Sequence, residues 1–271
     1  MGTEIMNNLN GLYRSIISVF FLLLAGTGSA QDACGGPTDL LSFLDRPSVT
    51  DSACSVPEKN VLVETGYQYQ LLTGGGNQHN VPSAVLRLGL ADRFEVNISL
   101  PDYIHQSMHP RAGFTGTTLG VKRELIATEK FVFALEGSVT PSSGSSGFGS
   151  QKTGGEMAGV ALYTFTSTLS ISGKLGYTSQ SESVQEGGQS FTSINPDVVL
   201  SWTTDKYSFY GELDGETRTG CQQGSGYNMD FGIIYLLRKN IAVDFEVGQR
   251  ISGTNYDFNQ YVGAGISFQM S

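Results

Sequence analysis

Acidic side chains recur at alternate positions near the end of the chain, as in Glu212, Asp214 and Glu216. Residues two apart share one face of a β-strand, so these three carboxylates are expected to lie side by side. Asp244 and Glu246 repeat the same spacing on a later segment. Carboxylates grouped in this way either attract cations across water or form ion pairs with bases from other strands.

Three bases, Arg87, Lys122 and Lys174, are predicted to share the face that carries these acids. One hypothesis is a water-filled constriction with a transverse field, which would favour cations or polar solutes. The alternative is salt-bridged filler in a narrow, partly closed interior. The candidate set that lines this interior is Glu64, Arg87, Glu95, Lys122, Glu136, Lys174, Asp197, Glu212, Asp214, Asp230, Asp244 and Glu246.

Other catalytic or metal-binding chemistry has little support in the sequence. His79, His105 and His109 are the three histidines, all in predicted loops, and no third ligand accompanies the last two, so no metal site is predicted. The glycine-rich stretches are not placed between a strand and a helix, so no cofactor is expected. An enzyme with a Ser or Asp nucleophile beside His79 remains an alternative, but the prediction is a protein without catalytic activity.

The elements that must position these charges are short amphipathic strands. From Val61 to Leu71 apolar and polar residues alternate, which is the period of a strand with one apolar and one polar face. Strands of this kind are predicted over 60–71, 81–90, 94–100, 114–126, 130–140, 155–165, 169–178, 193–203, 207–216, 226–237, 241–250 and 258–271.

The connections between these strands alternate in length. Short turns are predicted at 91–93, 127–129, 166–168, 204–206 and 238–240, and longer loops at 72–80, 101–113, 141–154 and 179–192, with a further loop around Cys221. Charged residues are 15% of the chain and hydrophobic residues 39%, which is too few for a bundle of membrane helices. These features predict an all-β, transmembrane, antiparallel up-and-down β-barrel of about twelve strands over residues 59–271.

Aromatic residues gather near the predicted strand ends, as interfacial girdles of a membrane barrel would. The band near the short turns is predicted to hold Phe94, Phe131, Phe133, Phe165, Trp202, Tyr207, Phe209, Tyr235 and Phe268. The opposite band is predicted to hold Tyr67, Tyr69, Tyr177, Tyr227 and Tyr261. The last strand carries apolar residues on one face and small or polar residues on the other, and it is expected to pair with the strand that begins near Val61.

The first 58 residues differ from the rest. Residues 1–30 combine Arg14, a short apolar run and small residues before Ala30, as a secretory signal peptide does. Residues 31–58 are predicted to form a short periplasmic extension or plug. Cys34 and Cys54 lie there, and their pairing in a disulfide is favoured because it closes a short loop. Free thiols, or a lipid anchor at Cys34, are the alternatives.

Several runs resemble one family of outer-membrane barrels, the phenol meta-pathway transporter-like proteins. They are Val63-Glu-Thr-Gly-Tyr-Gln-Tyr69, Pro82-Ser-Ala-Val-Leu-Arg-Leu-Gly-Leu-Ala-Asp-Arg-Phe-Glu95, Leu119-Gly-Val-Lys122 and Tyr261-Val-Gly-Ala-Gly-Ile-Ser-Phe268. The resemblance covers most of 60–271 and implies a channel in the cell outer membrane for small solutes, with aromatic compounds among them. It implies lipid and a small solute as partners, and no nucleic acid. A lipase-like barrel or a partner-binding scaffold remains an alternative, and the oligomeric state stays open.

Overall fold

The computed structural model describes residues 33–34, 40–184, 187–253 and 258–271. The predicted signal peptide, residues 1–30, therefore lies outside the described residues. Among the residues described, no helix has both the length and the apolar character needed to cross a membrane. Fourteen strands and two short 3-10 helices make up the regular structure of the described chain.

The strands follow one another along the chain in a single sheet. Their bounds are β1 Val61–Leu72, β2 Asn77–Leu90, β3 Phe94–Ser99, β4 Tyr103–Gln106, β5 Ala112–Phe114, β6 Thr118–Ala127, β7 Phe131–Thr140, β8 Gly154–Thr164, β9 Leu169–Ser181, β10 Ser190–Thr203, β11 Tyr207–Glu216, β12 Gly226–Arg238, β13 Ile241–Gly253 and β14 Phe258–Met270. The 3-10 helices are η1, Leu40–Ser42, and η2, Ala91–Arg93.

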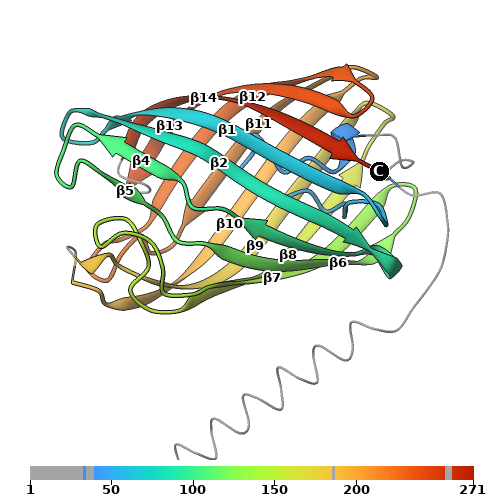
Figure 1. The fold of residues 1–271 in the computed structure, drawn as a ribbon. Coiled ribbons are helices and arrows are strands. Elements are labelled where there is room, and N and C mark those ends of the chain that lie inside the picture. Colours follow the sequence, from blue (N-terminus) through green and yellow to red (C-terminus); the bar gives the residue numbers. More distant parts are fainter. Residues whose placement is uncertain (1–32, 35–39, 185–186, 254–257) are drawn as a thin grey trace, which may run out of the picture. The chain divides into compact units, whose positions relative to one another are not determined.

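The sheet closes on itself as an antiparallel barrel (Figure 1). β14 pairs with β13 on one side and with β1 on the other, from Val61 opposite Met270 to Leu72 opposite Phe258. The predicted pairing of the last strand with the strand near Val61 is thus confirmed. Closure leaves backbone donors and acceptors hydrogen-bonded within the wall, which a hydrocarbon environment requires.

The wall has twelve positions because two of them are built from two strands each. β3 and β4 both pair along β2, and the chain between them contains Pro101, which has no backbone donor to continue the ladder. β5 and β6 form the next position in the same way. The predicted loop over 101–113 is therefore wrong at 103–106 and 112–113, which belong to β4 and β5. The predicted loop over 72–80 is wrong for most of its length, because only residues 73–76 connect strands.

Apolar side chains face outward along these strands. On β11, Leu213 is 50% exposed while its neighbours Glu212 and Asp214 are each 3% exposed. This is the reverse of a soluble barrel, in which apolar residues fill the interior. An apolar outer face suits lipid, because an Arg or Lys on that face costs about 2–4 kcal/mol at the bilayer midplane.

Aromatic residues of the short-turn end contact one another on the outer surface. Tyr207 stacks on Tyr235 with ring centroids 4.8 Å apart, and Trp202 lies 5.6 Å from Phe209. The predicted place of Tyr261 in the opposite band is wrong. Its ring points into the lumen and is 5% exposed, because it occupies an inward position of β14.

Residues 40–58, which we call the plug, lie inside the barrel near its short-turn end (blue in Figure 1). Phe43 is 1% exposed, and with η1 it packs on inward side chains of the wall that include Leu62, Val132 and Ile234. Cys34 forms a disulfide with Cys54, the pairing that the sequence favours. The apolar core of the described chain is therefore small and lies between the plug and inward side chains of the wall.

Candidate functional site: the plugged lumen

Carboxylates of the barrel wall hold the plug by its backbone. Glu64 accepts hydrogen bonds from the amides of Asp45 and Arg46, the latter at 2.9 Å. Glu212, on the other side of the barrel, accepts from Val49 at 2.9 Å and Thr50 at 2.7 Å. Irregular backbone has no ladder to satisfy its N–H groups, so buried carboxylates serve that purpose through charge-assisted bonds.

Two further acids bind the next turn of the plug. Glu95 accepts from the amide of Val56 at 2.8 Å, and Glu124 accepts from the amide of Ser55 at 2.7 Å. Glu124 was not in the predicted lining set. It lies on β6 beside a bulge in the pairing with β7, and its sequence position alone gave no sign of a partner in the plug.

Arg87 is the central base of the lumen and is fully buried. Its guanidinium lies 2.7 Å from Glu95, 2.8 Å from Glu64 and 2.9 Å from Asp45 of the plug. It also donates to the carbonyl of Phe43. Arg87, on β2, thus links Glu64 of β1 and Glu95 of β3 to Asp45 of the plug. This arrangement agrees with salt-bridged filler rather than with a free charge facing water.

Lys122 and Lys174 hold the plug from the other side. Lys122 donates to the carbonyl of Ser52 at 2.8 Å, and Lys174 lies 2.7 Å from Asp51 and 3.1 Å from Glu136. Burial opposes ionisation of Asp51, yet the two lysines hold its pKa below the ordinary range. Asp51 is therefore an anion that fixes this part of the plug to the wall.

Asp45 behaves differently from Asp51. Burial raises its pKa to about 7, although Arg87 and Lys122 favour the charged form. Asp51 and Glu64 add repulsion, since acids outnumber bases around it. Asp45 is thus the plug carboxyl whose protonation changes near neutral pH.

Arg46 of the plug enters a notch in the wall at the seam between β1 and β14. Gly66 and Gly265 face each other there, and a Cβ on either would collide with the Arg46 guanidinium. Asp244 receives the guanidinium at 3.2 Å. The small inner face of the last strand, which carries no charge, is therefore shaped to receive a charge from the plug.

The remaining predicted acids lie on β10–β13, and one of them, Asp197, is the cross-strand partner of Lys174 on β9. Asp214 accepts from the Asn228 amide at 3.0 Å, and Glu246 lies 3.4 Å from the Gln68 amide. Asp197 accepts from the backbone of Gly215 at 3.4 Å. The predicted lining residues thus fall into two groups, one attached to the plug and one on the β10–β13 wall, and Asp230 belongs to the second.

A gap of about 210 Å³ separates the plug from the inner wall of β8–β12. It reaches from the turn at 166–168, at the short-turn end, to Tyr210. Its wall is mainly hydroxyl-bearing, with Thr164, Ser170, Ser172, Ser201, Thr203 and Ser208. The prediction centred on charges and missed this sector; the signal was the alternation of Ser and Thr on the inward side of 168–172 and 201–203.

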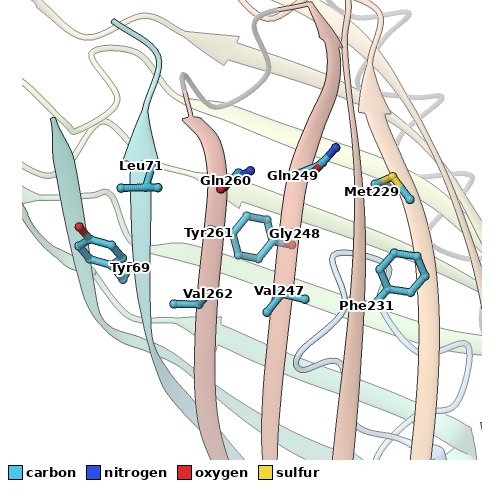
Figure 2. Close-up of a pocket in the computed structure, with 10 residues that line it drawn as sticks. All are labelled: Tyr69, Leu71, Met229, Phe231, Val247, Gly248, Gln249, Gln260, Tyr261 and Val262. Carbon is cyan, nitrogen blue, oxygen red and sulfur yellow. The ribbon is translucent and has the colours of Figure 1, made fainter. Parts of the chain in front are cut away.

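Further hollows lie elsewhere. A cavity of about 180 Å³ beside Asp45 and Asp51 reaches the inner faces of β6 and β7. A depression of about 660 Å³ on the outer surface spans β12, β13, β14 and β1 and is floored by Gly248, with Phe231 and Tyr69 on its borders (Figure 2). This second hollow faces outward, so it does not belong to the lumen.

The histidine considered for catalysis lies on the outer side of β2. His79 Nδ1 is 2.7 Å from the Tyr67 hydroxyl, and its ring packs near Tyr69 and His105. Within the described parts of the chain, no three His, Cys, Asp or Glu residues are close enough together to hold a metal ion.

A closed antiparallel barrel of twelve positions, apolar outside, polar inside and girdled by aromatics, is an outer-membrane β-barrel. Residues 44–270 match the family described as "Putative MetA-pathway of phenol degradation". The chain belongs to this family, as the resemblance of its strands implies. No curated protein matches the sequence.

Solved structures show the same fold at low sequence identity. An outer-membrane channel from Pseudomonas putida F1 aligns with a TM-score of 0.66 and 9% identity, over 82% of this chain and 100% of that one. The KdgM porin aligns with a TM-score of 0.51 and 14% identity, over 77% and 99% of the two chains. The NanC porin aligns with a TM-score of 0.52 and 10% identity, over 78% of this chain and 100% of that one.

Proposed function

We propose that this protein is a passive channel of the bacterial outer membrane, and that small solutes cross it through the gap between the plug and the hydroxyl-lined wall. The observation that carries the proposal is that gap, which extends along the plug from the short-turn end into the lumen. Glu64, Glu212 and Arg87 bind the plug to other parts of the wall. Exported through the predicted signal peptide, the chain would place its short turns in the periplasm.

The lining of the gap indicates the class of solute. Serine and threonine hydroxyls both donate and accept hydrogen bonds, so they favour small neutral molecules with hydroxyl groups over ions. The family's description points to phenol degradation, which agrees with hydroxylated aromatic compounds as solutes. The porins and channel named above support transport as the role of this fold, although their low identity makes this a proposal for the present chain.

Solute flux into liposomes tests the proposal. Purified protein is reconstituted, and swelling rates are compared for neutral polyols, hydroxybenzoate and an organic ammonium ion of similar size. Neutral hydroxylated solutes are expected to enter fastest, and anions slowest because acids outnumber bases in the lumen. No flux of any solute from correctly folded protein would contradict a channel and favour a partner-binding scaffold.

The enzyme alternative is separated by a second assay. We infer that the protein is a channel rather than a lipase-like enzyme, because the side chains in contact with His79 are Tyr67, Tyr69 and His105 rather than a nucleophile. Esterase activity should be absent in both the wild-type protein and His79→Ala. Activity that disappears in the variant would favour the enzyme.

A further inference from the structure

The inner wall of β11–β13 holds a group of hydrogen-bond acceptors without matching donors. Asp230 is fully buried, and neither of its carboxylate oxygens has a hydrogen-bond partner. The amide oxygen of Asn228, which is 1% exposed, also lacks a partner. The Tyr210 hydroxyl lies near enough to Asp230 to interact with it, but a single phenol can serve only one of these oxygens. Buried polar atoms are normally satisfied, so this group points to a missing donor.

Strand pairing places Glu212 and the ring of Tyr261 next to Asp230. Glu212 is its cross-strand partner on β11, and Gly248 is its partner on β13. The ring of Tyr261 occupies the place that a side chain at Gly248 would take, and Figure 2 shows this ring lying toward Gly248.

A second ring approaches from the other side in the same manner. Tyr210 is opposite Gly232, and its ring fills the space above that glycine, so a Cβ there would collide with it. Asp230 is two residues from Gly232 on the same face of β12. The carboxylate therefore lies between two phenol rings, each seated on a glycine.

Two arginines of this side of the lumen, Arg46 and Arg250, are bound to other groups. Arg46 pairs with Asp244, and Arg250 donates to the Asn259 carboxamide at 2.7 Å. Across the described ranges, no lysine or arginine forms an ion pair with Asp230. Glu212 is engaged by the plug backbone, so the site lies directly beside the plug.

We propose that this group of acceptors, centred on Asp230, binds a compact organic ammonium ion. An ammonium group carries only donors, which complements a set made of carboxylates, an amide oxygen and phenol oxygens. The rings of Tyr210 and Tyr261 can add cation–π attraction. A metal ion fits less well, because the acids of the described chain do not converge in threes at metal-ligand spacing.

Binding of benzylammonium to the purified full-length barrel in detergent tests the site, measured by calorimetry with benzyl alcohol as the neutral analogue. Wild-type protein should bind benzylammonium and not benzyl alcohol. Asp230→Asn, which keeps the shape and removes the charge, should weaken binding at least about tenfold. Glu216→Gln removes a lumenal acid of β11 outside the site and should change binding by less than about twofold.

Three results would overturn the site. They are no binding to wild-type protein, equal binding to Asp230→Asn, and equal weakening by Glu216→Gln, which would mean a general attraction to acidic lumen. If Asp230→Asn does not fold, Tyr210→Leu keeps every acid and removes one ring, and binding should fall several-fold; unchanged binding would overturn the site. Calorimetry does not require conduction, so this result is independent of the proposed channel.

Discussion

At the scale of single residues, buried charge is the main feature of this lumen. Arg87 satisfies three carboxylates and one carbonyl without contact with water. A buried ion network of this kind adds little net stability over a well-packed apolar core, but removal of one member leaves the others uncompensated. The charges therefore act mainly to set where the plug sits.

Arg87→Met is expected to destabilise the protein by about 3–5 kcal/mol, because Glu64, Glu95 and Asp45 would lose their common counter-charge. The free energy of unfolding is measured in urea by Trp202 fluorescence, after folding into detergent or vesicles. Arg238→Met, at the exposed end of β12, is the matched control and should change stability by less than about 0.5 kcal/mol. Equal stability of wild type and Arg87→Met would contradict a network role.

At the scale of elements, the strands followed from the sequence and the plug contacts did not. The alternation along β11 predicts its bounds at 207–216, because a membrane wall imposes a strict period of two. By contrast, strand periodicity carries no information on Leu40–Ser42 or on the carboxylates that bind plug amides. Those contacts join residues far apart in the chain, such as Thr50 and Glu212, and become visible only when the barrel closes.

The predictions for β4 and for Tyr261 are wrong for related reasons. β4 contains polar residues and follows Pro101, so the sequence predicts a loop there, yet β4 pairs with the far end of β2. Tyr261 has the residue type of an interfacial girdle, but its inward position and the empty space at Gly248 place its ring in the lumen. In both cases the residue type alone predicts the wrong location. The side of the strand on which a residue falls, and the space left by its neighbours, determine where it lies.

Docking of the plug should depend on pH through Asp45. The pKa of Asp45 is raised from 3.8 to about 7, so its carboxyl binds a proton more tightly in the docked plug than in a released plug. The resulting stabilisation is fully present below the ordinary pKa and is lost as pH rises through about 7. Asp51 has a lowered pKa, so its attachment to Lys174 is retained across this window.

Conductance in planar bilayers should therefore be lower at about pH 5 than at about pH 8, because a docked plug leaves only the narrow gap open. Asp45→Asn cannot titrate and should reduce or abolish this difference. A pH response of the same size in Asp45→Asn would show that other groups control it.

At the scale of the whole molecule, closure of the barrel depends on β14. This strand pairs with β13 and β1 along nearly its entire length. The plug then fills the short-turn end and replaces a conventional core with a polar, ion-paired one. Lipid outside accounts for the apolar outer face of the strands, and the plug inside accounts for the few apolar residues, such as Leu62 and Val132, that face inward.

Deletion of Phe268–Ser271 should prevent closure, because it removes the residues that pair with Val61, Leu62 and Val63. The expected result is loss of the heat-modifiable folded form on gels and loss of protein from the outer-membrane fraction. Removal of Ser271 alone, which follows β14, should leave folding unchanged. Normal folding of the longer deletion would mean that β14 is dispensable for closure.

If solutes pass beside the plug, a bulky side chain placed in the gap should reduce their flux. Ser201 lines the gap, whereas its neighbour Leu200 faces outward and is 53% exposed. Liposome swelling with a small neutral polyol should fall several-fold in Ser201→Trp and stay near wild type in Leu200→Trp, with both variants folded. Wild-type flux through Ser201→Trp would contradict the proposed path.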